Sequence, residues 1–279
     1  MTKILITGAA GSIGGELYRQ LAPYNTVFAF DIDETRLFDL HEEHRQKGYD
    51  VDYMIGDVVD RRAVDDVVYD FRPDVIYHVA ALKHVTPHEK DARAAVQTNV
   101  IGTLNVVDAA RRSKVNKFVF VSTDKAVNQH CVMGTTKRLG ELIVRNAGYV
   151  AVRFGNVMGS RGSVFEIWER QFAKGEPLTI TDKRMKRYVM TIPQACELLI
   201  EAKDVGKPGD LLILDMGEPV AILDIVAEFL KQKGVDYHPF KIIGARPGEA
   251  LFESLMTKDE EKRVIKRGNF YVIEHEKNN

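Results

Sequence analysis

Two short stretches of the chain carry the side chains that could transfer protons. The first, Ser122-Thr123-Asp124-Lys125, places a hydroxyl, a carboxyl and an amine directly after an apolar run. The second contains Met133 and, four residues later on the same helix face, Lys137. A tyrosine at the first of these positions could act as a general base at a hydroxyl being oxidised, whereas methionine has no proton to exchange. We therefore expect Met133 to pack beside the site and the proton chemistry to fall to Asp124 and Lys125.

A glycine-rich turn near the N-terminus indicates a dinucleotide site. Gly8, Gly11 and Gly14 follow the first apolar run and open the first amphipathic segment, the context that makes such a motif informative. Gly8 permits a tight turn, Gly11 lets the backbone approach a pyrophosphate, and Gly14 allows close helix packing. The free N–H groups of the helix would bind the pyrophosphate. The expected contacts in this turn are Gly8, Ala10, Gly11, Ser12, Ile13 and Gly14.

Acidic residues after the next runs indicate which dinucleotide binds. Asp31 ends the second run about 20 residues after the motif, where a carboxylate accepts from ribose hydroxyls. It would repel a 2′-phosphate, so NAD is favoured over NADP, although the nearby Arg36 keeps NADP open. Asp57, in Gly56-Asp57-Val58, would lie by the adenine amino group. We also expect cofactor contacts from Val58, Ala80, Ala81, Lys83, Asn99 and Lys137, the last at the nicotinamide ribose.

The elements that must position these residues alternate along the chain. Nearly continuous runs of Val, Ile and Phe are typical of strands buried on both faces of a parallel sheet, here 4–7, 26–30, 51–55, 75–79, 117–121 and 149–154. Amphipathic segments between them predict helices over 12–21, 34–46, 62–70, 92–112 and 133–146. This order predicts a Rossmann-type, doubly wound α/β sheet. Thr123, Asp124 and Lys125 then lie beyond the carboxyl end of the fifth strand, where such sheets bind ligands.

The alternation loosens after about residue 156, where glycine and proline recur. Helices are expected at 164–174, 193–203 and 222–233, with short strands at 211–214 and 240–243. We therefore divide the chain into an NAD-binding domain over residues 1–156, which also carries the catalytic residues, and a smaller α/β lobe over 157–279. The second lobe would bind substrate and interleave with the first.

The bulk composition disfavours several classes of protein. A net charge of −1 over 279 residues gives no sign of a nucleic-acid or membrane surface. The N-terminus enters a strand rather than a signal peptide, and no apolar run is long enough to span a bilayer. Two cysteines without metal-binding spacing are typical of a reducing compartment. We expect a cytoplasmic protein with no metal.

Ordered motifs run through essentially the whole chain: 80–85, 98–103, 122–128, 133–138, 153–157, 159–164, 187–191, 215–219 and 246–249. In these motifs the chain resembles the nucleotide-sugar 4,6-dehydratases of the extended short-chain dehydrogenase/reductase superfamily, in the polysaccharide-biosynthesis branch that acts on UDP-N-acetylglucosamine. Met133 in the tyrosine position resembles the members that retain configuration at C5, and Asp31 with Glu34 resembles those that use NAD. Departures at Thr86, Gln129 and 182–184 lie in loops near the expected substrate pocket.

The resemblance implies a reaction and a division of roles. The sugar is oxidised at C4, loses the C5 proton and the C6 oxygen as water, and is reduced at C6, so one acid and one base must lie near C5 and C6. By resemblance Asp124 is the acid at O6, Lys125 the base at C5, and Thr123 a hydrogen-bond partner of O4. Lys125 must be neutral, so we expect its pKa to be lowered by burial or by Lys137. O4 could lose its proton to Lys125 or to a water relayed through Thr123.

Further residues are expected to line the sugar-nucleotide pocket. Asn99 lies in a helix, where asparagine is unfavoured, which predicts that it bridges the backbone and an active-site water. Arg187 and Arg246 could clamp a diphosphate bidentately, and Glu249 could accept from the uridine ribose. The expected substrate contacts are Lys83, His84, Asn156, Arg161, Ser163, Val164, Thr179, Arg187, Arg246 and Glu249.

Two other functions stay open. One is a UDP-sugar 4-epimerase or a C5-inverting 4,6-dehydratase, chemistries that more often keep the tyrosine. The other is an NAD-binding regulator without activity, against which the intact Asp124 and Lys125 argue. Large family members carry transmembrane segments that this chain lacks, which predicts a free-standing soluble unit with a UDP-sugar as its partner. A homo-oligomer is expected by resemblance.

Overall fold

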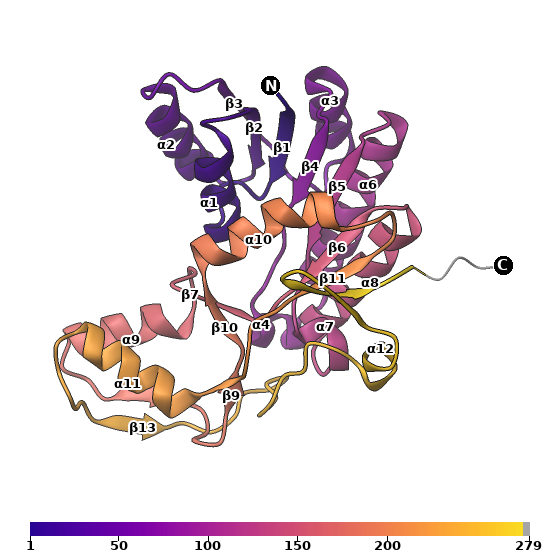
Figure 1. The fold of residues 1–279 in the computed structure, drawn as a ribbon. Coiled ribbons are helices and arrows are strands. Elements are labelled where there is room, and N and C mark those ends of the chain that lie inside the picture. The colour runs from indigo at the N-terminus through magenta and orange to yellow at the C-terminus, as the bar shows by residue number, and fades with distance from the viewer. Residues whose placement is uncertain (276–279) are drawn as a thin grey trace.

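The computed structural model describes residues 1–275 and confirms the doubly wound α/β fold (Figure 1). Within these residues, seven neighbouring strands, from β3 at one edge to β11, pair in parallel. Beyond β11 the sheet continues with β15, which is antiparallel to β11, and then with β14, which is antiparallel to β15. The chain reverses direction across the sheet between β1 and β4, the kind of point where such sheets bind ligands. The order is β14 (Ile265–Arg267), β15 (Phe270–Ile273), β11 (Leu211–Leu214), β6 (Val150–Arg153), β5 (Lys117–Val121), β4 (Val75–His78), β1 (Lys3–Thr7), β2 (Thr26–Asp31) and β3 (Val51–Ile55).

Helices cover both faces of this sheet, because alternate strand residues point to opposite sides. Ile4 and Ile6 pack in one apolar cluster with residues of α1 (Ser12–Leu21), α2 (Glu34–Arg45) and α10 (Ile192–Val205). Leu5 packs in the other, with residues of α3 (Arg61–Phe71), α6 (Thr103–Arg112) and α8 (Val132–Asn146). The strands are therefore buried on both faces, as their continuous apolar character predicted.

The expected helix over 92–112 is broken into three pieces. It consists of α5 (Arg93–Val96), a π-helical segment η1 (Gln97–Gly102) and α6. The Thr103 hydroxyl donates to the carbonyl of Asn99 at 2.7 Å, and the Asn99 side chain turns away to bind Leu82. Local hydrogen bonding by Asn and Thr thus competes with the regular helix ladder, and π-helical turns of this kind are frequent near functional sites.

Two short helices at the carboxyl edge of the sheet were not expected. They are α4 (Val85–Lys90) and α7 (Lys125–Asn128). Because β5 ends at Val121, Thr123 and Asp124 lie in a turn, and Lys125 begins α7 rather than ending the strand.

A smaller group of elements lies apart from the sheet (Figure 1). Trp168 of α9 (Val164–Ala173) and Phe229 of α11 (Ile222–Gln232) share its apolar cluster with ring centroids 5.7 Å apart. The chain then passes through α12 (Lys258–Glu261) and returns to the main sheet as β14 and β15. The short strands pair as β7 (Asn156–Met158) with β10 (Val189–Thr191), β8 (Leu178–Ile180) with β13 (Phe240–Ile242), and β9 (Lys186–Arg187) with β12 (Val220–Ala221).

Candidate active site

A cleft with a volume of about 630 Å³ opens at the carboxyl ends of the parallel strands. Most of the residues expected to bind the dinucleotide line it, together with four residues from the expected chemical centre, of which Lys137 was expected in both roles. Gly14 and Asn99 are not among the lining residues. Those that line it are Gly8, Ala10, Gly11, Ser12, Ile13, Asp31, Asp57, Val58, Ala80, Ala81, Lys83, Thr123, Lys125, Met133 and Lys137.

The glycine-rich turn has the close packing that its sequence predicted. Gly8 adopts a φ of +73°, and a Cβ there would lie 2.5 Å from the backbone nitrogen of Ala80. A Cβ on Gly14 would overlap the carbonyl oxygen of Gly8. Gly11 stands at the N-cap of α1, and because glycine has no side chain to cap the helix, the first N–H groups of α1 stay free of a side-chain cap among residues 1–275 and can bind an anion in the cleft.

Asp31 connects this turn to the end of β2. Its Oδ2 accepts from the backbone N–H of Ala10 at 2.8 Å, and its Oδ1 accepts from that of Asp33 at 2.9 Å. The carboxylate still lines the cleft, where each oxygen has a further lone pair for a ribose hydroxyl. Arg36, which had kept NADP open, pairs with Asp33 at 3.0 Å.

Asn99 was expected to contact the cofactor or a water, but it does not line the cleft. Its side chain is fully buried, and its amide both donates to and accepts from the backbone of Leu82, at 3.0 and 2.8 Å. The amide also donates to the Thr136 hydroxyl at 2.9 Å. Asn99 therefore fixes the loop after β4 against α8. This is the backbone contact that we expected of it, although its side chain does not line the cleft.

A second cavity, of about 420 Å³, adjoins the first and is lined by elements of the smaller group. The two cavities meet at six residues that line both of them: Lys83, His84, Lys125, Asn156, Val157 and Ser160. The expected substrate contacts that line the second cavity are Lys83, His84, Asn156, Ser163, Val164, Thr179, Arg187, Arg246 and Glu249.

Arg161 lies on the dinucleotide side instead. Its guanidinium donates to the carbonyl of Ala10, and its backbone N–H donates to the Ser12 hydroxyl at 3.0 Å. The loop after β7 therefore closes over the glycine-rich turn, which moves Arg161 away from the cavity where we expected it. Burial, with the charge of Arg161, lowers the pKa of Lys83.

Two side chains in the second cavity bear on anion binding. Ser163 stands at the N-cap position of α9, but its hydroxyl makes no capping hydrogen bond and is buried without a hydrogen-bond partner among residues 1–275. It stands beside the N-terminus of that helix, which favours an anionic group. Arg187 already donates to the carbonyls of Ala250 and Leu251, at 2.8 and 2.9 Å, so only part of its guanidinium remains for a ligand.

The expected acid and base form one hydrogen-bonded cluster. Asp124 Oδ1 accepts from the Thr123 hydroxyl and from the Lys125 Nζ, each at 2.9 Å. The Lys125 Nζ also reaches the Asn156 Oδ1 at 3.4 Å. Lys125 faces both cavities, whereas Asp124 is 1% exposed and lines neither.

The charge state of Lys125 differs from our expectation. Burial lowers its pKa, but the carboxylates of Asp124 and Glu253 outweigh burial and raise it overall. The expectation of a lowered pKa for Lys125 is therefore wrong, because two anions surround this ammonium. The lowered value belongs to Lys137, whose pKa burial reduces to about 7 against the opposing charge of Glu141. The Lys137 Nζ lies 4.0 Å from the centre of the Phe120 ring.

Glu253 was not expected at the site. Its Oε1 lies 3.9 Å from the Lys125 Nζ, its side chain is 7% exposed, and it lines the second cavity. Burial, with the charge of Asp124, raises its pKa against the opposing charge of Lys125. The segment 251–255, Leu-Phe-Glu-Ser-Leu, offers no signal for this role, because it matches no motif of catalytic residues.

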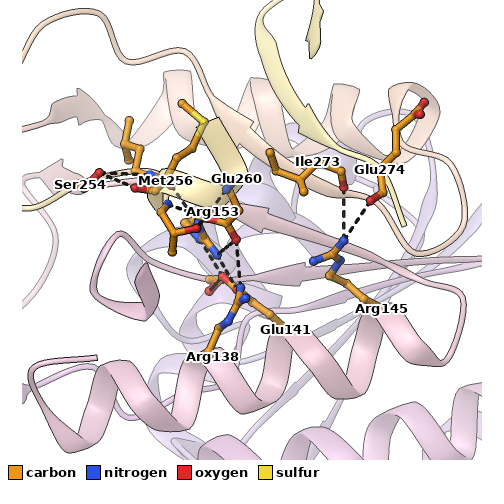
Figure 2. A network of polar contacts seen from close by, with 12 residues as sticks. Arg138, Glu141, Arg145, Arg153, Ser254, Met256, Glu260, Ile273 and Glu274 are labelled. Carbon is orange, nitrogen blue, oxygen red and sulfur yellow. Dashed lines mark hydrogen bonds and ion pairs between the residues drawn. The ribbon is translucent and has the colours of Figure 1, made fainter. Parts of the chain in front are cut away.

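A buried ionic network anchors the segment that carries Glu253 (Figure 2). The Arg153 guanidinium, fully buried on β6, binds Glu141 of α8 at 2.7 Å and Glu260 of α12 at 2.9 Å. It also donates to the carbonyl of Leu255 at 2.9 Å. Burial would raise the pKa of Glu260, but the hydrogen bond and charge of Arg153 lower it to about 2.

Two other kinds of feature are absent from residues 1–275. No helix there is both long and apolar enough to cross a membrane. No group of three or more His, Cys, Asp or Glu side chains in that range could hold a metal ion.

A family model for polysaccharide biosynthesis proteins matches residues 4–275. The chain belongs to this family. The capsular polysaccharide biosynthesis protein CapD of Staphylococcus aureus is 39% identical over 271 residues, which cover 92% of this chain and 45% of that protein. The chain thus spans about half the length of this relative. A UDP-glucose 4-epimerase of Rickettsia prowazekii is 32% identical over 285 residues, 97% of this chain and 82% of that protein.

Solved structures extend the comparison. The X-ray structure of Pen from Bacillus thuringiensis matches with a TM-score of 0.90 and 35% identity, over 98% of this chain and 87% of that one. More distant structures, several of them complexes with NAD, have TM-scores of 0.77 to 0.80 at 21% to 23% identity and share the fold alone. The family and its extended short-chain dehydrogenase/reductase fold agree with the expected resemblance.

Proposed function

We propose that this chain dehydrates UDP-N-acetylglucosamine to the 4-keto-6-deoxy sugar with retained configuration at C5. The observation that carries the proposal is Lys125, held by Asp124 at the junction of the two cavities. A cofactor in the first cavity and a sugar nucleotide in the second would meet there. The division into a cofactor part over 1–156 and a substrate part over 157–279 belongs to the same proposal.

NAD is the cofactor that we propose. The uncapped N-terminus of α1 and the tight Gly8–Gly14 turn fit a pyrophosphate, and the Asp31 carboxylate fits unphosphorylated ribose hydroxyls. Bound NAD would supply the oxidant for C4 and, after elimination, the reductant for C6. Lys137, which lines the cleft together with Thr123 and Met133, would hold the nicotinamide ribose.

The chain's own residues would handle the protons. Thr123 would hydrogen-bond O4, and Lys125 would take the C5 proton once it has lost its own. The acid at O6 must be a carboxyl of this cluster, and the resemblance assigns it to Asp124. Met133 adds no titratable group, so O4 would lose its proton to Lys125 or to a water held by Thr123.

A 4-epimerase is the second candidate, because the Rickettsia prowazekii relative carries that name. Both reactions begin with oxidation at C4. They differ in the step after this oxidation, since only dehydration needs an acid and a base at C5 and C6. The Asp124–Lys125 pair beside the second cavity favours dehydration.

Proton NMR in deuterated water tests the proposal. Incubation with UDP-N-acetylglucosamine should replace the C6 hydroxymethylene signals with a methyl signal, next to a C5 that carries deuterium. Appearance of UDP-N-acetylgalactosamine would instead identify the epimerase. No change with this or any other sugar nucleotide would favour a non-catalytic, NAD-binding role.

We also propose that the chain forms a homo-oligomer. Exposed leucine and isoleucine side chains gather on three neighbouring segments, η1, α6 and α8. Contiguous exposed apolar surface is typical of self-association. The side chains are Ile101, Leu104, Leu139 and Leu142.

A further inference from the structure

We infer that Glu253 is a catalytic residue of this site: its carboxyl delivers the proton to the oxygen that leaves C6. This inference rests on the proposed dehydration and changes which carboxyl acts as its acid. Glu253 lines the second cavity, and its Oε1 lies 3.9 Å from the Lys125 Nζ. Asp124 lines neither cavity and is 1% exposed, so its carboxyl is closed off from the substrate space in this structure.

The two carboxylates are engaged in different ways. Asp124 Oδ1 accepts from the Thr123 hydroxyl and the Lys125 ammonium, which fixes Lys125 toward the junction of the cavities. Glu253 holds Lys125 only at ion-pair distance, and a move of about 1 Å would bring the two into hydrogen-bond range. Asp124 is thus suited to orient the amine, and Glu253 to exchange protons with it.

The backbone around Glu253 is held on both sides. Arg187 donates to the carbonyls of Ala250 and Leu251, and Arg153 donates to the carbonyl of Leu255. Both arginines are buried. Glu253 is therefore fixed opposite Lys125 by the segment that carries it, as a catalytic group requires.

Burial of Glu253 favours a bound proton on its carboxyl. Two carboxylates, Asp124 and Glu253, flank one ammonium in a buried setting, and like charges disfavour joint ionisation. Burial and Asp124 raise the pKa of Glu253, while Lys125, Arg187 and His130 oppose the rise. These are the charged groups that face it from the turn after β5, from α7 and the loop after it, and from β9.

The proton transfers balance without any further reactant. Lys125 gives one proton to Glu253, which leaves a neutral amine and a neutral carboxylic acid. The amine takes the proton from C5, and the C–H electron pair becomes the C5–C6 double bond. The C6–O bond breaks onto oxygen, which takes the Glu253 proton and leaves as water. Lys125 is again an ammonium and Glu253 again a carboxylate.

Glu253→Gln tests this assignment, because the amide keeps the shape and removes the exchangeable proton. We expect the rate of methyl formation to fall about 100-fold or more, the usual contribution of a general acid. Oxidation at C4 should continue, so reduced nicotinamide absorbance should build up on the enzyme. Glu253→Asp should recover part of the rate. Glu261→Gln, an exposed glutamate eight residues along, is the matched control and should behave as wild type.

A second readout needs no turnover. Reductive methylation with ¹³C-formaldehyde labels lysine amines, Lys125→Ala identifies the Lys125 signal, and its shift can be followed against pH. Glu253→Gln should lower the pKa of Lys125, because one of the two raising carboxylates is gone. If the wild type dehydrates no sugar nucleotide, the proposed function fails, and the catalytic role of Glu253 fails with it. The titration still reports separately whether the charges of Glu253 and Lys125 are coupled.

Three results would overturn the inference. One is wild-type elimination in Glu253→Gln with an unchanged pH profile. Another is an unshifted Lys125 titration. The third is a block of elimination after C4 oxidation in Asp124→Asn but not in Glu253→Gln. That result would return the role of the acid to Asp124.

Discussion

Arg153→Met would leave two buried carboxylates without the guanidinium that they share. Arg153 binds Glu141 at 2.7 Å and Glu260 at 2.9 Å, and none of the three side chains is more than 2% exposed. Removing one partner of a buried ion pair costs about 3–5 kcal/mol. The pKa of Glu260 gives an independent figure: a fall from 4.5 to about 2 corresponds to about 3 kcal/mol, at about 1.4 kcal/mol per unit. The two figures agree on a loss of about 3 kcal/mol of unfolding free energy.

The same interaction predicts a pH dependence. The pKa of Glu260 is lower in the folded state than in the unfolded one, so its stabilisation is complete above pH about 4.5 and is lost as the pH falls toward 2. The difference in unfolding free energy between wild type and Arg153→Met should therefore shrink by about 1 kcal/mol between pH about 7 and about 3.5. Urea unfolding followed by circular dichroism measures both quantities.

An exposed arginine provides the control. Arg184 pairs with Asp182 but is 71% exposed, so Arg184→Met should cost less than about 0.5 kcal/mol. A loss below about 1 kcal/mol in Arg153→Met at neutral pH would refute the view that this network anchors the segment around Glu253. So would a loss that does not change in acid.

Three further predictions concern the cofactor cleft and the surface. Lys137 has a pKa of about 7 in the folded state and 10.5 in the unfolded state, so the unfolding free energy of the wild type should rise by up to about 1.4 kcal/mol per pH unit between these two values. Urea unfolding of Lys137→Met should lack this rise. An equal rise in the variant would contradict the burial of the ammonium. Gly14→Ala should abolish NAD binding in calorimetry, because its Cβ would overlap the Gly8 carbonyl oxygen; wild-type affinity would contradict the tight turn. Leu139→Asp should lower the mass measured by light scattering, and an unchanged oligomer would exclude the α6–α8 surface as the interface.

The dinucleotide part of the site could be predicted because its causes are local. Gly8 takes a positive φ in the turn, Gly11 and Gly14 pack against the backbone of that same turn, and Asp31 follows at the end of the next strand. The apolar runs specified the parallel sheet because strands buried on both faces lose their alternation. Neither inference required knowledge of contacts between distant segments.

The errors arose where distant segments meet. Asp124 and Glu253 together raise the pKa of Lys125 against its burial. Asp124 is its neighbour in the sequence, but Glu253 comes 128 residues later, and no local pattern predicts that contact. Arg161 was expected at the substrate, but its loop folds back on Ala10 and Ser12. Asn99 binds the backbone of Leu82, as expected, but which backbone segment it would meet could not be predicted, because Leu82 lies 17 residues earlier.

The central claim is that the sugar is oxidised at C4 and reduced at C6 within one active site. The most direct test uses UDP-N-acetylglucosamine carrying deuterium at C4, in ordinary water, followed by NMR of the product. We expect a C6 group of the form CH₂D, because the deuterium removed from C4 returns to C6. Deuterium found at C4 of UDP-N-acetylgalactosamine, or a C6 methyl without deuterium, would contradict it.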